Sequence, residues 1–268
     1  MTFTHLHVHS HYSILDGMSK ISELVDKCQR TGMNAMALTD HGNMFGIKEF
    51  SDYAKKVNSA LNRKVKECEE ELDKIPLEIE RNEKIVASPS NANALAQATA
   101  AIERLRARRI ELEKKLPELK QKVAEYIPFK PIFGIETYCA PVSIDVRRNR
   151  PDRGWHLILL AKNKVGYHNL CKLSSIAYTD GFYYNPRIDY ALLEKYHEGL
   201  IICSACLGGE LPQKIMDGDI DGAEKAIRWF KNLVGDDYYI EIQRHQTTKP
   251  GADQEVFQRQ QEVNAVLL

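Results

Sequence analysis

The sequence predicts an α/β fold with an inserted, long antiparallel helical hairpin, and two observations carry this prediction. Before residue 58 and after residue 127, short apolar segments typical of strands alternate with amphipathic segments typical of helices, the order of an α/β fold with parallel strands. Between these positions the chain is rich in Glu, Lys, Arg, Ala and Leu and contains no strand-like segment. We therefore expect three regions, namely 1–57, an inserted arm at 58–127, and 128–268.

The first region alternates strands and helices. Residues 3–9 alternate polar and apolar side chains, which predicts a strand. Ser19 is the expected cap of a helix that Gly32 ends. Residues 35–39 form a short apolar segment, expected to be the second strand, and a helix is expected over about 45–57.

The inserted arm is expected to consist of two helices. The sequence Ala-Ser-Pro-Ser-Asn at 87–91 interrupts the helical pattern near its middle, and Asn91 or Asn93 is expected to start the second helix. Apolar residues then recur at helical steps of three, four and seven: Leu95, Ala98, Ile102, Leu105, Leu112, Leu116, Leu119 and Val123. This predicts a coiled-coil hairpin. It either contacts a partner protein or, as is more common for charged helices, is a solvated addition without a catalytic role.

After the arm the α/β pattern resumes and continues to residue 268. Strands are expected at 130–138, 155–161, 200–203 and 238–243, and helices at 163–179, 210–216, 220–234 and 253–268. No terminal cap and no closing strand follow the last helix, so we expect the sequence to be C-terminally truncated.

Composition restricts the class of protein. The 37 Lys and Arg residues balance the 37 Asp and Glu residues, whereas a stand-alone nucleic-acid-binding protein usually has a basic excess. No apolar segment is long enough to span a bilayer, and the first residues lack signal-peptide character. We therefore expect a cytoplasmic protein with no membrane contact, whose six cysteines are thiols or metal ligands rather than disulfides.

Residue types that bind metals fall in or near the expected strands. His7 and His9 lie two apart on a strand and so project from one face. The others at such positions are His41, Glu136, His156 and Cys206. Sites in α/β folds gather at the carboxyl ends of strands, and imidazole with carboxylate suits zinc, manganese or iron. A single buried histidine is more often a hydrogen-bonded core residue, but several at strand positions favour a metal site.

Several motifs, in order along the chain, resemble one family. They are HLHVHS (5–10), YSILDG (12–17), LTDHGNMFG (38–46), PIFGIE (131–136), HLILLAKN (156–163), GYHNL (166–170), GFYYNPRID (181–189) and GLIICSACLG (199–208). Together they closely resemble the PHP (polymerase and histidinol phosphatase) domain at the N-terminus of bacterial DNA polymerase III alpha subunits. The resemblance covers nearly everything except the arm.

The resemblance implies a distorted (β/α)7-type barrel that binds up to three divalent metal ions. It places metal ligation on His7, His9, Asp16, His41, Glu136, His156 and Cys206. Glu136 is expected to bridge two ions. The final motif of the family, an Asp-x-His, is absent from this sequence, so fewer metal ions are expected here.

Neighbouring residues have expected roles around these ligands. His5 is expected to orient another side chain or to be structural, and Asp40 to polarise a ligand histidine. Cys203 and Cys206 form a Cys-x-x-Cys, which would suit a redox pair or a zinc knuckle. Because no second cysteine pair is present, we interpret Cys206 as a ligand and Cys203 as a core residue.

Arginines form a second group of candidates. Arg147, Arg148, Arg150 and Arg153 precede His156 and either line a solvated loop or hold a phosphate or a DNA strand near the metals. Arg187 is a similar candidate for phosphate binding.

Three functions follow from the resemblance. The first is metal-dependent hydrolysis of a phosphoester, as a 3′–5′ exonuclease within a DNA-directed DNA polymerase (a nucleotidyltransferase), with DNA, the rest of the polymerase chain and replisome subunits as partners. The second is a non-catalytic module that braces the polymerase or docks a proofreading subunit, favoured by the neutral charge and the arm. The third, more distant, is a stand-alone small-molecule phosphatase.

Overall fold

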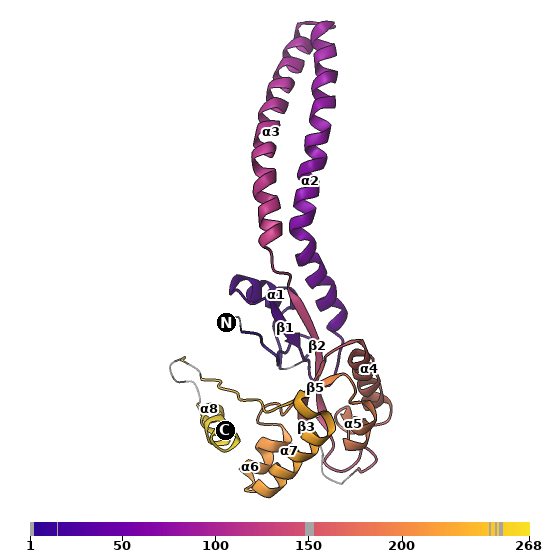
Figure 1. The fold of residues 1–268 in the computed structure, drawn as a ribbon, viewed down its shortest axis with the longest axis vertical. Coiled ribbons are helices and arrows are strands. Elements are labelled where there is room, and N and C mark those ends of the chain that lie inside the picture. The colour runs from indigo at the N-terminus through magenta and orange to yellow at the C-terminus, as the bar shows by residue number, and fades with distance from the viewer. Residues whose placement is uncertain (1–2, 15, 148–152, 247, 250, 252–253) are drawn as a thin grey trace. The chain divides into compact units, whose positions relative to one another are not determined.

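The computed structural model describes residues 3–14, 16–147, 153–246, 248–249, 251 and 254–268. It separates into two compact units, one of Met1–Tyr53 with Lys130–Leu268 and the other of Ala54–Phe129 (Figure 1). Among the described helices, none combines the length and the apolarity needed to cross a bilayer.

The first unit is built on a mixed six-stranded sheet. Its strands are β1 (Ala35–Leu38), β2 (Lys130–Cys139), β3 (Trp155–Ala161), β4 (Arg187–Ile188), β5 (Leu200–Cys203) and β6 (Tyr238–Tyr239). The order is β1-β2-β3-β5-β6, with β4 also paired to β2. This establishes a mixed α/β unit, while closure into a barrel stays a prediction.

The expectation of parallel strands is wrong for β3. β1–β2, β2–β4 and β5–β6 are parallel, but β3 is antiparallel to both β2 and β5. A parallel neighbour requires a long crossover, usually a helix, whereas an antiparallel neighbour does not. Between β2 and β3, none of the described residues at 140–147 and 153–154 is helical, so the chain turns back along β2.

Several of the described helical segments lie wholly within the first unit. They are α1 (Ile21–Arg30), α4 (Lys164–Thr179), α5 (Tyr190–Tyr196), α6 (Glu210–Met216), α7 (Ile220–Val234), the 3-10 turn η1 (Gly235–Asp237) and α8 (Glu255–Leu267). One core cluster joins strands to helices; its members include Leu157, Leu159, Leu170, Leu173, Ile202 and Phe230. The sheet therefore forms a rigid support for the side chains at its ends.

Several sequence-based expectations for this unit need correction. Residues 3–9 do not form the expected strand. They pair with β1 through one isolated bridge, between His5 and Met36. Lys20, not Ser19, is the N-cap residue of α1, and it makes no side-chain cap bond. The strand expected at 238–243 is limited to β6. β4 and α5 were not expected, although Asp189 caps α5 by accepting a hydrogen bond from Leu192 N.

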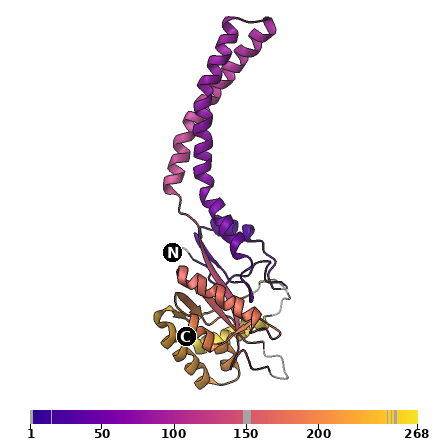
Figure 2. The same ribbon diagram turned by 90° about the vertical axis from the view of Figure 1, so that its right-hand side faces the viewer.

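The second unit contains most of α2 (Ile47–Ala87) and all of α3 (Ala92–Glu125). α2 is one unbroken helix, so the helix expected at 45–57 and the first helix of the arm are the same element. Asn91 caps α3 by accepting from Ala94 N. The two helices run side by side in opposite directions (Figure 2).

Apolar and charged contacts hold α2 against α3. Cys68, Ile75, Leu112 and Leu119 are buried together, as the apolar periodicity requires. Ion pairs join the helices at their surface, including Arg108 with Glu71 and Lys120 with Glu69. At the base, Asn58 donates to Phe129 O and accepts from Phe129 N and from the Tyr126 hydroxyl.

The first turn of α4 allows a test of the packing in the first unit. A Cβ atom on Gly166 would lie 1.8 Å from the carbonyl oxygen of Gly199, and backbone cannot move aside easily. Gly166→Ala should therefore lower the free energy of unfolding by roughly 1–3 kcal/mol, although alanine favours helices. Val165→Ala, at an exposed neighbouring position, should change it by less than about 0.5 kcal/mol. Urea denaturation of both variants measures this, and equal stability would show that the close approach is relaxed.

Candidate metal centre

One buried carboxylate lies at the centre of a histidine cluster. Glu136 on β2 is 1% exposed. Four imidazole nitrogens approach its two oxygens: His7 Nε2 at 3.2 Å, His9 Nε2 at 3.3 Å, His41 Nδ1 at 2.5 Å and His156 Nδ1 at 2.9 Å. We call these five residues, with the Asp16, Cys206 and Glu241 side chains described below, the metal centre.

The sheet positions two of these histidines directly. His41 comes just after β1, and its backbone forms a bridge with Glu136 on the neighbouring parallel strand. Gly42 N donates to Glu136 O at 2.7 Å, which fixes the loop after β1. His156, at the start of β3, pairs with Tyr138 because β3 runs antiparallel to β2. The reversed direction of β3 is thus the reason that a residue at the start of a strand reaches a site near the end of β2.

Two further predicted ligands complete the group. Cys206 Sγ lies 3.3 Å from His156 Nδ1 and 3.6 Å from Glu136 Oε1. Ala205 has a φ of 63°, a conformation that a residue with a side chain rarely adopts, and it turns the chain just before this thiol. Asp16 Oδ2 lies 3.4 Å from His41 Nε2, and its side chain is 61% exposed. The structure therefore brings all seven predicted ligands together.

Glu241 was missed by the sequence analysis. Its Oε1 lies 2.7 Å from His7 Nδ1, on the side of the ring opposite to Glu136. Gln243 contacts both Glu241 Oε1, at 2.5 Å, and His7 Nδ1, at 3.2 Å. A signal was present, since Glu241 interrupts a strand-like apolar segment as Glu136 does, but no motif drew attention to it.

A buried hydrogen-bond network supports the histidines from behind. Asp40 is 2% exposed and accepts from Ser10 N at 2.6 Å and from Ser13 Oγ at 2.7 Å. Ser13 Oγ lies 3.2 Å from His9 Nδ1 and accepts from His41 N at 3.0 Å. Asp40 therefore acts on His9 and His41 through Ser13, a residue that the sequence analysis did not single out, and not by direct contact.

Other candidates lie away from the centre. His5 is exposed, and its described ring contact is with Phe3, at 4.8 Å. Cys203 is buried in the apolar core, which raises the pKa of its thiol to about 12. Burial of this thiol favours a core role over a redox or zinc pair.

The arginine candidates differ in position. Arg147 and Arg153 are exposed, while Arg148 and Arg150 lie outside the described residues. Arg187 is fully buried and donates to the carbonyl oxygens of residues 144, 146 and 181 at 2.9, 3.5 and 3.3 Å. Its guanidinium holds two loops together, which favours a structural role over phosphate binding.

Electrostatics couple the members of the centre. Burial alone would raise the pKa of Glu136, but the adjacent imidazoles of His156, His41 and His7 outweigh it and hold the pKa well below its usual range. Burial opposes the charged form of His7, yet the carboxylates of Glu136 and Glu241 raise its pKa to about 9. Burial lowers the pKa of His9 to about 4, assisted by the charges of His41 and His7.

His156 follows the same logic as His7. Burial opposes its charged form, but hydrogen bonds with Cys206 and Glu136 raise its pKa to about 9. In the metal-free protein, protonated His7 and His156 therefore face the buried carboxylate of Glu136 at neutral pH.

The donor set fits divalent metal ions. Two triads have their ligand atoms within 4.8 Å of one another, one of His7, His9 and Glu136, the other of His41, Glu136 and His156. Glu136 Oε2 is buried and has no hydrogen-bond donor in acceptable geometry, although two ring nitrogens face it. Imidazole, carboxylate and thiolate are ligands of zinc, manganese and iron. A cation beside Oε2 would supply the partner that this oxygen lacks.

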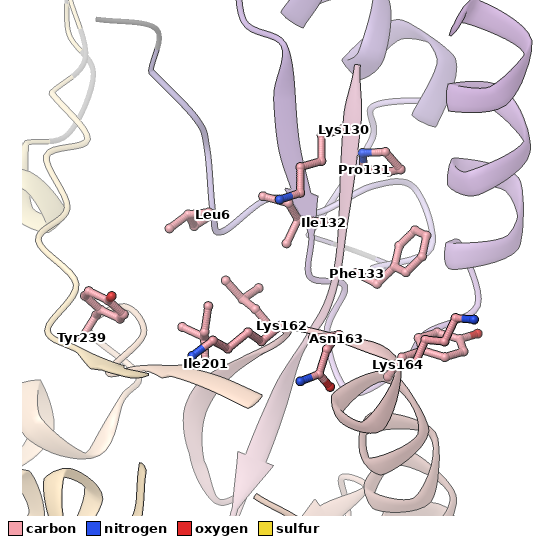
Figure 3. A pocket seen from close by; sticks show the side chains of 13 residues that line it. Leu6, Lys130, Pro131, Ile132, Phe133, Lys162, Asn163, Lys164, Ile201 and Tyr239 are labelled. Atoms are coloured by element: carbon pink, nitrogen blue, oxygen red, sulfur yellow. The ribbon is translucent and has the colours of Figure 1, made fainter. Parts of the chain in front are cut away.

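A separate cavity lies at the start of β2, at the end of the strand away from Glu136. This cavity of about 650 Å³ is lined mainly by apolar side chains, among them Leu6, Ile132, Leu160 and Ile201, with lysines at 130, 162 and 164 (Figure 3). None of its described lining residues is His, Cys, Asp or Glu. It does not supply metal ligands.

The fold and the centre define an α/β domain with a histidine–carboxylate cluster able to hold divalent metal ions. The chain matches the PHP domain over residues 5–87 and 89–245, and it belongs to that family. It is similar to DNA polymerase III subunit alpha of Borreliella burgdorferi, at 38% identity over 246 residues, covering 91% of this chain and 15% of the relative.

Other relatives give the same result. The DNA polymerase III subunit alpha of Treponema pallidum is 36% identical over 251 residues, with 91% of this chain and 15% of the relative covered. That of Deinococcus radiodurans is 33% identical over 253 residues, with 91% and 14% covered. The chain thus spans about 15% of the length of the curated relatives it matches.

The coupling of the histidines to Glu136 is testable in the metal-free protein. His7 and His156 should titrate near pH 9 and His9 near pH 4. Glu136→Gln removes the charge without changing the size, and should lower the titration midpoints of His7 and His156 by about 1–3 pH units. Imidazole NMR shifts followed against pH measure this, with the exposed His168 as internal reference. Unchanged midpoints would show that Glu136 does not set the charge of the cluster.

Proposed function

We propose that the metal centre hydrolyses a phosphoester bond, and one observation carries the proposal: a buried carboxylate within 3.3 Å of four imidazole nitrogens. Clusters of this composition hold transition-metal ions at carboxylate–histidine sites. When bound, such ions lower the pKa of water and withdraw charge from phosphoryl oxygens.

The side chains divide into buried and accessible members. His7, Glu136 and Glu241 form the enclosed side, and they would hold metal where little water enters. Asp16 is 61% exposed and lies beside His41, so it completes the cluster on the side open to substrate. We propose that divalent ions, zinc, manganese or iron, bind to the seven predicted ligands and Glu241, and that they number fewer than the three of the intact family domain.

The relatives suggest the setting of this activity. They are named as DNA polymerase III subunit alpha, so we propose that the chain acts within a cytoplasmic replicative DNA polymerase, a nucleotidyltransferase, together with DNA. The proposed reaction is removal of nucleotides from a 3′ end. The rest of the polymerase and replisome subunits, including a proofreading subunit, are the proposed partners.

A second candidate function is structural, and the origin of the ligands favours it. His7 and Glu241 are separated by 234 positions in the sequence, and Glu136 and Cys206 by 70. Metal ions shared among such segments would cross-link the first unit and stabilise it, with or without catalysis. The two functions make different predictions for Asp16, which is exposed, and for His7, which is buried.

Metal affinity should depend on pH. At neutral pH, His7 and His156 hold protons that a metal ion must displace, because their pKa is about 9 in the metal-free protein. Affinity for zinc or manganese should therefore increase as pH rises from about 6.5 to about 9, by up to about 100-fold per unit where two protons are released. Titration calorimetry in buffers of different ionisation enthalpy measures both affinity and proton release. Affinity independent of pH in this range would contradict binding at these histidines.

Hydrolysis should depend on the centre in a graded way. We expect manganese- or zinc-dependent cleavage of bis(4-nitrophenyl) phosphate, reduced roughly 100-fold or more in Glu136→Gln. In Asp40→Asn we expect a loss of about 10–100-fold, because this residue only orients ligands through Ser13. His168→Ala, an exposed histidine on α4, should retain full activity.

Asp16→Asn separates the catalytic from the structural function. Catalysis predicts loss of hydrolysis with unchanged thermal stability, since this side chain is exposed. If the metal-loaded protein shows no cleavage, while His7→Ala unfolds and Asp16→Asn does not, the centre is structural.

A further inference from the structure

A row of exposed aromatic rings begins four residues after His41. Phe45, Tyr178 and Phe182 are 65%, 41% and 50% exposed, and Tyr184 is 61% exposed. The ring centroids of Phe45 and Tyr178 are 6.2 Å apart, and those of Tyr178 and Phe182 are 6.3 Å apart. We call these four residues the aromatic row. Exposed apolar side chains that gather in this way usually mark a binding surface.

Tyr138 and Pro186 place the aromatic row next to the metal centre. The ring of Tyr138 lies 6.0 Å from that of His41, and stacks on it. Pro186, two residues after Tyr184, packs beside them: a Cβ atom on Gly42 would lie 2.8 Å from Pro186 Cγ and 3.1 Å from Tyr138 Cε2. The loop that carries the end of the row therefore lies against the loop that carries a candidate ligand.

Tyr184 adopts a strained backbone conformation. Its φ is 62°, in the left-handed region that tyrosine disfavours. Its ring remains exposed, so burial does not compensate for the strain. Among the described residues, the other non-glycine residue with positive φ is Ala205, which precedes the candidate ligand Cys206. Strain of this kind is concentrated at functional sites.

We propose that the aromatic row is a stacking surface for unpaired nucleobases, which positions the end of a single strand at the metal centre. The proposal rests on the phosphoester hydrolysis proposed above and names the substrate class of that site. Each base has a flat face that stacks on an aromatic ring irrespective of sequence. A duplex end keeps its bases paired and stacked on one another, so the row favours a frayed or single-stranded end.

Charge around the row favours stacking over a phosphate grip. Arg153 is exposed next to it, where Asn185 Nδ2 donates to the Arg153 carbonyl at 3.3 Å. Asp180 is also exposed and lies between Tyr178 and Phe182 in the sequence. Binding that depends on neutralised phosphates weakens steeply with salt, whereas stacking does not. The affinity of the row is therefore expected to depend only weakly on salt.

The test is binding of an oligothymidylate with 2-aminopurine at its 3′ end, whose fluorescence is quenched when the base stacks. With no metal added, wild-type protein should quench it, and Phe182→Ala should bind at least 10-fold more weakly. Tyr239→Ala, which removes a tyrosine that is 54% exposed near the apolar cavity (Figure 3), should bind as wild type does.

Tyr184→Asn distinguishes binding from a structural role. Asparagine tolerates the left-handed region, so the melting temperature should stay the same or rise while the affinity for the oligonucleotide falls 10-fold or more. If Tyr184 had only a structural role, Tyr184→Asn would instead lower the melting temperature.

Equal quenching by wild-type, Phe182→Ala and Tyr184→Asn proteins would overturn the proposal. An absence of quenching by the wild-type protein would also overturn the proposal. It would indicate that the aromatic row binds a protein segment instead. Cleavage of bis(4-nitrophenyl) phosphate, which is too small to span the row, reports separately on the proposed hydrolysis. If the protein stacks the base but does not cleave the small ester, the result supports base binding by the aromatic row and contradicts the proposed hydrolysis.

Discussion

The structure of the first unit depends on one buried charge. Removing a carboxylate from water is unfavourable unless cations or hydrogen-bond donors surround it, and Glu136 is 1% exposed. Its neighbours are imidazoles, which can satisfy it either as protonated donors or as co-ligands of a metal ion. In the metal-free state the raised pKa of His7 and of His156 supplies the first solution. A bound metal ion would replace these protons within an arrangement of side chains that already exists.

The fold makes this arrangement possible because it brings the ends of several strands to one place. β1 ends shortly before His41, and β5 ends three residues before Cys206. β3 begins at Trp155, the residue before His156. Parallel pairing of β1 with β2 and antiparallel pairing of β3 with β2 place the end of one strand and the start of another side by side. A wholly parallel sheet would have put His156 at the far end. The mixed sheet is therefore a requirement of the centre.

The sequence predicted which side chains gather around Glu136 better than it predicted the framework. His7, His9 and His41 stand out because polar, metal-binding side chains are unusual in apolar strand segments and because they lie in motifs. The direction of β3 could not be predicted from periodicity, which is the same for either direction. Ser13 and Glu241 were missed because each acts through contacts with residues distant in the sequence. The position of Arg187 beside tyrosines in the sequence does not reveal that its guanidinium donates to three carbonyl oxygens.

The gradient of exposure across the centre indicates how substrate would enter. Glu136 is enclosed, whereas the Asp16 side chain is 61% exposed. Tyr138 lies between these extremes, with His41 on one side, and burial with the nearby carboxylates raises its pKa to about 12. It therefore stays a neutral phenol beside the cluster and adds no charge that would repel a phosphodiester. The formal charges of the chain balance, so long-range attraction for a polyanion is weak. A neutral protein that hydrolyses such a substrate must recognise it at short range, and rings that stack on bases supply recognition of that kind.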